Sequence, residues 1–126
     1  MQSLLGNTRK PDVSFYRSGR IDITSNVAKI LHLQSGDVID VAKNEKDFFL
    51  YIKHKAKDII GKHEAQCFGT NKGKECHNFR CYSARLCYAI LTECHANECA
   101  RLPIGEAGEF NGQPIVPIIT RNNLTK

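Results

Sequence analysis

The sequence lacks any segment that would carry it into or across a membrane. No apolar run reaches 18 residues, and the pair Leu4-Leu5 near the start is followed by a polar stretch up to Lys10. A membrane-spanning helix needs about 20 mainly apolar residues, and a secretory signal needs an apolar stretch of about 7–15 residues. We therefore expect neither a membrane span nor secretion, and we expect a cytoplasmic protein.

The sequence also lacks the short motifs of common catalytic sites. It contains no nucleophile elbow, no phosphate-binding loop, no H-E-x-x-H and no dinucleotide-binding fingerprint. Cysteine and histidine are adjacent at Cys76-His77, but adjacency along the chain does not orient an imidazole onto a thiol. We expect a binding protein that is not an enzyme.

A third absence concerns the cysteines, none of which forms a C-x-x-C pair. All six cysteines follow residue 66, and without a secretory signal we expect reduced thiols. Cys87 and Cys94 share a stripe of a helix predicted over 83–100, with Leu91 between them, which is typical of buried core residues.

The alternative is a zinc site, since thiolate and imidazole are the ligands of tetrahedral structural zinc. The candidate ligands are Cys76, His77, Cys81, Cys94 and Cys99. Their spacing fits none of the usual structural-zinc patterns. We therefore expect no cofactor, and zinc remains the alternative.

The net charge of +5 is unevenly distributed along the 126 residues. Basic residues outnumber acidic ones in residues 1–20 and 53–80, whereas the segment 21–52 is acidic. A solvated surface of ordinary composition explains such a charge equally well. The functional interpretation is a surface for a polyanion, because contacts with phosphate supply most non-specific affinity for nucleic acid.

The chain divides into an arm and two units joined by a connector. Residues 1–12 have no periodicity and are predicted to form a flexible arm. Residues 13–54 form a β-α-β-β unit: strands at 13–17 and 20–23, a helix capped by Thr24 or Ser25 and ended by Ser35-Gly36-Asp37, and strands at 38–41 and 48–52 around a long loop. The last two strands are so apolar that we expect burial on both faces, and we expect their aromatic residues and Tyr16 to pack in the core.

Residues 55–78 are predicted to form a basic connector rich in glycine and lysine, with one strand near 65–68. A second strand-helix-hairpin unit follows at 79–121, packed on or paired with the first. Its predicted elements are a strand at 79–82, a helix capped by Ser83, a type I′ turn at Asn111-Gly112 and a last strand at 115–119. Pro114 and Pro117 push that strand towards a sheet edge or an irregular course. The fold class is thus mainly β with short helices, an α+β protein.

Residues 19–39 resemble the signature of the AbrB/MazE/SpoVT family of swapped-hairpin DNA-binding proteins. The family pattern is roughly G-R-[IV]-x-[IV]-P-x-x-[IL]-R-[KR]-x-L-G-[IL]-x-x-G-D. The chain matches this pattern without a gap at Gly19, Arg20, Ile21, Ile23, Val27, Lys29, Leu31, Leu33, Gly36 and Asp37. The similarity extends through the hairpin to Ile52, which is about a third of the chain.

The resemblance implies a homodimer with interleaved hairpins that binds duplex DNA as a transcriptional regulator or an antitoxin, in the latter case with a toxin as partner. The family's DNA surface is built from basic residues of the first strands and of the loop at the helix, which carries over to Arg20 and Lys29. We add basic residues nearby in the sequence, so that the predicted DNA contacts are Arg17, Arg20, Lys29, Lys53, Lys55 and Lys57.

The sequence departs from the family pattern at three positions. Thr24 replaces the proline before the helix, Ala28 replaces an arginine within it, and His32 replaces the following glycine. Loss of the helix arginine removes one expected contact with phosphate or base. Because the order of elements recurs at 79–121, we also predict a degenerate second copy. One chain would then supply both halves of what resembles a cradle-loop barrel, as a pseudo-symmetric monomer instead of a dimer.

Two alternatives to the DNA-binding regulator remain open. One is a non-catalytic protein-interaction or scaffold module on the same barrel, which Ala28 and the acidic segment 21–52 favour. The other is a zinc- or thiol-dependent binding module centred on the second unit.

Overall fold

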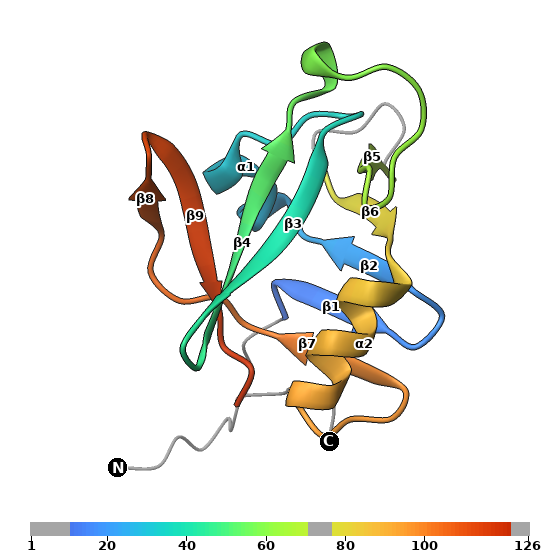
Figure 1. Cartoon of the computed structure of the whole chain (residues 1–126), viewed down its shortest axis with the longest axis vertical. Helices are drawn as coiled ribbons and strands as arrows, with labels where there is room; N and C mark the ends of the chain where they lie inside the picture. The colour runs from blue at the N-terminus through green and yellow to red at the C-terminus, as the bar shows by residue number, and fades with distance from the viewer. Residues whose placement is uncertain (1–10, 71–76, 122–126) are drawn as a thin grey trace.

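A computed structural model describes residues 11–70 and 77–121, which fold into two antiparallel sheets and two α-helices (Figure 1). The strands are β1 (Val13–Tyr16), β2 (Arg20–Ile23), β3 (Val38–Asn44), β4 (Asp47–His54), β5 (Phe68–Gly69), β6 (Phe79–Tyr82), β7 (Cys99–Leu102), β8 (Gly108–Phe110) and β9 (Gln113–Ile118). The helices are α1 (Ser25–Leu31), α2 (Ala84–Glu93) and the short 3-10 helix η1 (Ala56–Asp58). The predicted class, mainly β with short helices, is confirmed.

The strand order is β5-β6-β2-β1-β7 in one sheet and β3-β4-β9-β8 in the other. Two isolated bridges, Val38 with Gln66 and Ile104 with Ile118, connect the sheets near both edges of the five-stranded one. The sheets therefore enclose a single core. Within the described residues, no helix is both long and apolar enough to cross a membrane.

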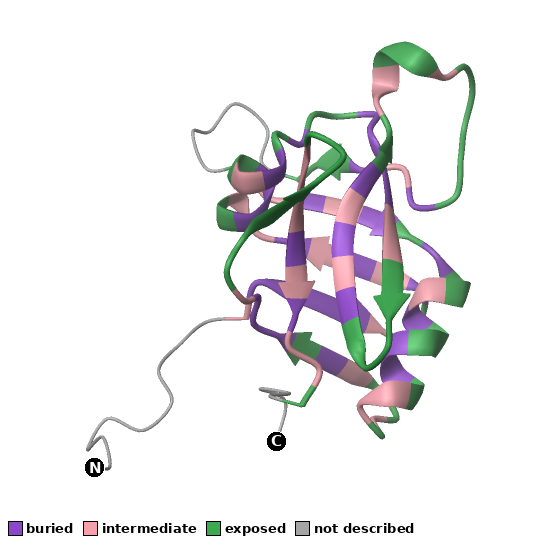
Figure 2. Ribbon diagram, turned by 60° about the vertical axis from the view of Figure 1, so that its left-hand side comes forward, coloured by how far each residue is buried: buried purple, intermediate pink, exposed green. Residues whose placement is uncertain are grey.

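The first strands form where the alternation predicts them. Ile21 and Ile23 are at most 1% exposed, whereas Arg20 and Asp22 between them are partly exposed. Figure 2 shows this alternation of buried and exposed residues along the strands. Because a strand directs successive side chains to opposite faces, each sheet presents one apolar face to the core and one mixed face to the outside.

Helix α1 starts where predicted but ends earlier. Thr24 is its N-cap, yet no cap hydrogen bond is formed by the Thr24 side chain. The helix ends at Leu31 because His32 adopts a left-handed conformation, with φ 59°. Gly36 does take the predicted positive φ, 97°, but in the turn that leads into β3. There is no room for a side chain at this turn, since a Cβ on Gly36 would lie 2.9 Å from Cβ of Ala56.

The β3–β4 hairpin differs from the prediction in two ways. The strands continue to Asn44 and from Asp47, so the expected long loop is a tight turn with Glu45 at φ 59°. Burial on both faces was also a wrong expectation: Leu50 and the inward residues beside it are buried, whereas Phe49 and Tyr51 are only partly covered.

The second unit confirms the local signals and corrects the long-range ones. The Ser83 hydroxyl accepts a hydrogen bond from the Leu86 N–H at 3.1 Å, as a cap should, and Asn111-Gly112 has the two positive φ values of a type I′ turn. Helix α2 ends at Glu93 instead of residue 100, and Cys99 belongs to β7.

One of the two positions expected for the last strand, a sheet edge, is wrong. β9 lies between β4 and β8 instead of at an edge. Pro117 is tolerated there because its backbone faces the 103–105 segment, where its carbonyl accepts a hydrogen bond from Gly105 N–H at 2.8 Å. The missing N–H of the proline is therefore not needed for the pairing with β4.

The two predicted units pack against each other, and each contains a helix that ends in the same way. α1 packs on β9, whereas α2 packs on β1, β2 and β7. Both helices end in the same hydrogen bonds: Leu33 N–H donates to Ala28 O and Ala96 N–H donates to Leu91 O, each at 2.9 Å. The residue before each donor, His32 or His95, is left-handed. This is the hydrogen-bond pattern of a Schellman motif.

Two cross-strand pairs join positions that correspond to each other when the two predicted units are aligned. Matching the buried residues of β2 with those of β6 aligns Asp22 with Arg80, and these two are direct cross-strand partners. Matching the hairpin turns at Glu45 and Asn111 aligns Leu50 with Val116, which are again direct partners. In a chain with an internal duplication, such pairs would lie on the twofold axis between the copies.

Candidate functional site

The outer face of the five-stranded sheet carries aromatic and arginine side chains from five strands. Cross-strand partners share a face, so the pairing defines two outward rows. One row runs from β5 to β7 through Phe68, Arg80, Asp22, Ser14 and Arg101. The other contains Tyr82 opposite Arg20, and Tyr16 opposite Cys99.

Two arginines of this face, Arg20 and Arg80, are held in position by neighbouring side chains. The Arg20 guanidinium lies 4.1 Å from the centre of the Tyr16 ring, within the range of a cation–π contact. Arg80 Nε donates to Asp22 Oδ1 at 2.7 Å, and this hydrogen bond is the main reason that the pKa of Arg80 is raised. Asp22 Oδ2 also lies 3.4 Å from Nε of Arg20. One carboxylate therefore orients two guanidinium groups.

Positive charge predominates on this face. Among the outward residues of the described strands, Arg20, Arg80 and Arg101 are basic and Asp22 is acidic. The side chains of Arg20 and Arg80 remain 35% and 41% exposed. Both guanidinium groups therefore keep donors available to an outside acceptor while their orientation is restricted.

A hollow of about 400 Å³ lies at the β5–β6 end of the face. Its lining is Lys62, His63, Gln66, Phe68, Gly69, Thr70, Arg80 and Tyr82. Phe68 and Tyr82 are 53% and 60% exposed, which is unusual for side chains of this size. Their exposure leaves an aromatic surface beside a cation.

The six predicted DNA contacts do not form one surface. Arg20 lies on the five-stranded face, and Arg17 follows β1, 3.6 Å from Glu98 in an exposed ion pair. Lys29 and Lys53 are exposed and line two different hollows, and Lys57 is exposed on η1.

Lys55 has a structural role. Its ammonium group donates to Asp37 Oδ2 at 2.6 Å and to the His32 carbonyl at 3.1 Å. Asp37 is fully buried and also accepts from the backbone N–H groups of Gln34 and Ala56, both at 2.8 Å. The charge of Lys55 is thus largely used within the fold, where it compensates a buried carboxylate.

Sequence reasoning missed Arg80, Arg101, Phe68 and Tyr82, and it placed Tyr16 in the core. The signal was present in the strand Phe79-Arg80-Cys81-Tyr82, where buried and outward residues alternate. That alternation indicates an outward face, but only the pairing with β2 shows that Arg20 belongs to the same surface.

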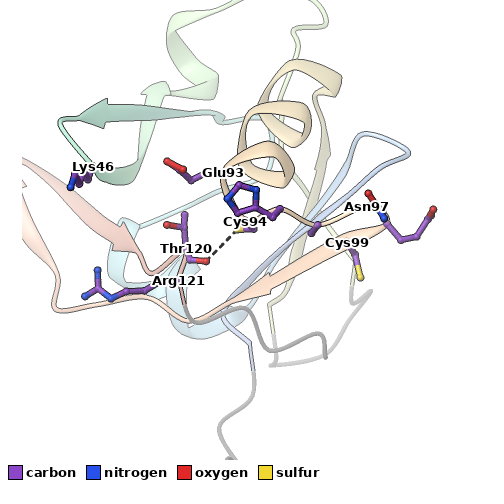
Figure 3. A pocket seen from close by; sticks show the side chains of 10 residues that line it. Lys46, Glu93, Cys94, Asn97, Cys99, Thr120 and Arg121 are labelled. Atoms are coloured by element: carbon purple, nitrogen blue, oxygen red, sulfur yellow. Dashed lines mark hydrogen bonds between the residues drawn. The ribbon is translucent and has the colours of Figure 1, made fainter.

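The largest hollow, about 820 Å³, lies between the end of α2 and the last residues of the described chain and contains two of the zinc candidates. In Figure 3 the Cys94 thiol points to Thr120, whose carbonyl accepts its hydrogen bond at 3.3 Å, while the Cys99 sulfur points away from Cys94. Over residues 11–70 and 77–121, no three histidine, cysteine or acidic side chains converge as metal ligands do. Cys76 lies outside the described residues, His77 lines another hollow and Cys81 is buried.

The thiols with a shifted pKa are the reverse of activated nucleophiles. None of the five described cysteines is in a disulfide. Burial raises the pKa of Cys87 and of Cys94 to about 11, so both are almost entirely protonated at neutral pH. Catalytic thiols have a lowered pKa instead. The pKa of Cys81 is raised further, chiefly by its hydrogen bond with Cys67.

Comparisons with known proteins do not add to this geometry: no family model, no curated protein and no solved structure matches the chain.

Proposed function

We propose that this protein binds nucleic acid without catalysing a reaction, as a small DNA-binding regulator or antitoxin-like protein. The binding surface is the outer face of the five-stranded sheet. The observation that carries the proposal is that, among the described residues, three outward arginines on β6, β2 and β7 share one sheet face with the Asp22 carboxylate and two tyrosines. Arginine combines charge with planar donors that fit phosphate and the guanine edge.

The fold proposed for this function is a swapped-hairpin cradle-loop barrel in which one chain supplies both halves. The equal hydrogen bonds at the ends of α1 and α2 support an internal duplication, as do the self-facing pairs Asp22–Arg80 and Leu50–Val116. The exchanged helix packing supports interleaved units. On this basis the functional state is a pseudo-symmetric monomer, with duplex DNA as the partner that the family resemblance implies.

A salt titration against duplex DNA tests the proposal. The observed affinity should fall linearly on a log–log plot with rising salt, with a slope of about −0.9 per phosphate contacted. Arg20→Ala should weaken binding about tenfold and reduce the slope by about one. The matched control is Arg85→Ala: this arginine on α2 is 86% exposed and paired with Glu64, outside the proposed surface. Undetectable binding at low salt would refute the proposal.

A second candidate function is protein interaction, which one observation favours. A hollow of about 490 Å³ on the four-stranded sheet is lined by Ala42, Asn44, Phe49, Tyr51, Phe110, Asn111, Gln113 and Ile115. Phe110 is 67% exposed, and exposed apolar patches mark interaction sites. A toxin or another protein bound at this hollow is compatible with DNA binding on the other sheet.

A further inference from the structure

The hollow at the β5–β6 end of the five-stranded face has the form of a site for one aromatic base. Phe68 is the cross-strand partner of Arg80, and Tyr82 follows two residues later on β6. Phe68 and Tyr82 are therefore diagonal neighbours on one face. Side chains in this relation have Cα atoms about 7–8 Å apart.

Side chains attached to Cα atoms at this separation can place one ring on each side of a planar group. Stacked bases follow each other at about 3.4 Å, so a base between two aromatic rings needs them about 7 Å apart. A pocket of about 400 Å³ has room for a base and its sugar. The two rings are half exposed, and stacking would remove their apolar faces from water.

Cations surround the rings. Lys62 and Arg80 line the same hollow, and Arg20 lies directly opposite Tyr82 in the strand pairing. A base held between the rings would thus place its flanking phosphates beside two or three positive charges. Aromatic platforms with interspersed arginine are the means by which sheets bind single strands.

We propose that this hollow binds an unpaired nucleobase stacked between Phe68 and Tyr82, with Arg80 and Lys62 on the adjoining phosphates. The substrate class is nucleic acid with unpaired bases. This inference rests on the proposed function, since it uses the same sheet face. It adds a preference that phosphate contacts alone do not create, because only an unpaired base presents both of its faces to the rings.

The test compares fluorescein-labelled (dT)12 with a 12-base-pair duplex in fluorescence anisotropy at low salt. Tyr82→Leu and Phe68→Leu should each weaken (dT)12 binding about tenfold or more, since one stacked base contributes that much, and should leave duplex binding within about twofold. Both side chains are more than half exposed, so folding should persist, which a thermal melt checks. The matched control is Tyr88→Leu, since this tyrosine on α2 is also exposed and does not line the hollow.

The outcomes separate this inference from the proposed function. Duplex binding without (dT)12 binding would overturn the base site and leave the regulator intact. The base site would also be overturned if the wild type and both leucine variants bound (dT)12 equally. The same holds if the leucine variants lost affinity for (dT)12 and for the duplex to the same extent. Failure to bind either probe would overturn both proposals. A second readout is intrinsic tyrosine fluorescence, since the chain has no tryptophan: at saturating (dT)12 its quenching should decrease in Tyr82→Leu and should be unchanged in Tyr88→Leu.

Discussion

The inner faces of the two sheets are both apolar, whereas their outer faces differ in charge. Both direct aliphatic side chains into the common core, where Ile21 and Leu50 are completely buried. The outer face of the five-stranded sheet carries Arg20, Arg80 and Arg101, whereas the hollow on the outer face of the four-stranded sheet is lined without a charged residue in the part of the chain that is described. Inward residues therefore specify the fold, and outward residues give each sheet a different partner chemistry.

The largest effect is expected on stability, at the junction between the two sheets. Asp37→Ala should destabilise the protein by about 3–5 kcal/mol, because it leaves the N–H groups of Gln34 and Ala56 and the Lys55 ammonium without their acceptor. Asp37 is also part of the junction between the sheets, since its carbonyl accepts from Cys67 N–H. Urea denaturation measures the change.

The matched control for this substitution is Lys57→Ala, an exposed lysine on η1, which should change stability by less than about 0.5 kcal/mol. If Asp37→Ala proves as mild as the control, the buried carboxylate does not support the junction.

Thiol alkylation should distinguish the inside of the five-stranded sheet from its outside. Burial raises the pKa of Cys87 to about 11 from an ordinary value of 9.0, so at pH 8 its thiolate fraction, and its rate with iodoacetamide, should be about 100-fold below those of an ordinary thiol. The rate should rise about tenfold per pH unit until pH approaches 11. Cys99, partly exposed on the outer row, should react first. Peptide mass spectrometry reads the order, and early labelling of Cys87 would contradict this placement.

Removal of the single acid from the arginine face should strengthen binding there. Asp22→Asn releases Arg80 and Arg20 from their carboxylate, so affinity for duplex DNA should rise about three- to tenfold at low salt. Anisotropy titration measures this gain, whose sign is opposite to that of Arg20→Ala. The control Asp58→Asn, on η1, should have no effect. A weaker complex would mean that Asp22 is needed to hold the guanidinium groups in place.

The smallest effect on nucleic-acid binding is expected from the other face. Phe110→Ser removes a side chain that is 67% exposed, so stability should change by less than about 0.5 kcal/mol and affinity for DNA should not change. The same substitution should abolish capture of any protein partner that uses the apolar hollow. A loss of DNA affinity in Phe110→Ser would show that the two faces are not independent.

Local signals in the sequence were sufficient for much of the fold. The alternation around Ile21 and Ile23, the capping serine Ser83 and the turn at Asn111-Gly112 each determine structure within a few residues. The ends of both helices were not predictable in this way, because a histidine in the left-handed conformation leaves no compositional sign. The left-handed conformation of His32 and His95 is accompanied by hydrogen bonds from the N–H groups of the next residues, Leu33 and Ala96, so it depends on the turn that follows each helix.

The candidate site depended on contacts between distant residues. Arg20 was predicted from the family resemblance, but its neighbour Tyr82 is brought to it by pairing of β2 with β6. The structural contact of Lys55 was missed for a similar reason, since its partner Asp37 lies in an earlier segment and the burial of Asp37 cannot be read from the sequence. Only the strand order shows which exposed residues share a surface.

The pairing of Asp22 with Arg80 has a consequence for the shape of the target. An assembly of two identical chains places the same residue on both sides of its axis, so that aspartate would there oppose aspartate. The duplicated chain proposed above is free of this restriction and has an acid opposite a base at 2.7 Å. For the proposed nucleic-acid function, such a surface has a polarity that a symmetric dimer lacks, which would suit a target that is not a palindrome.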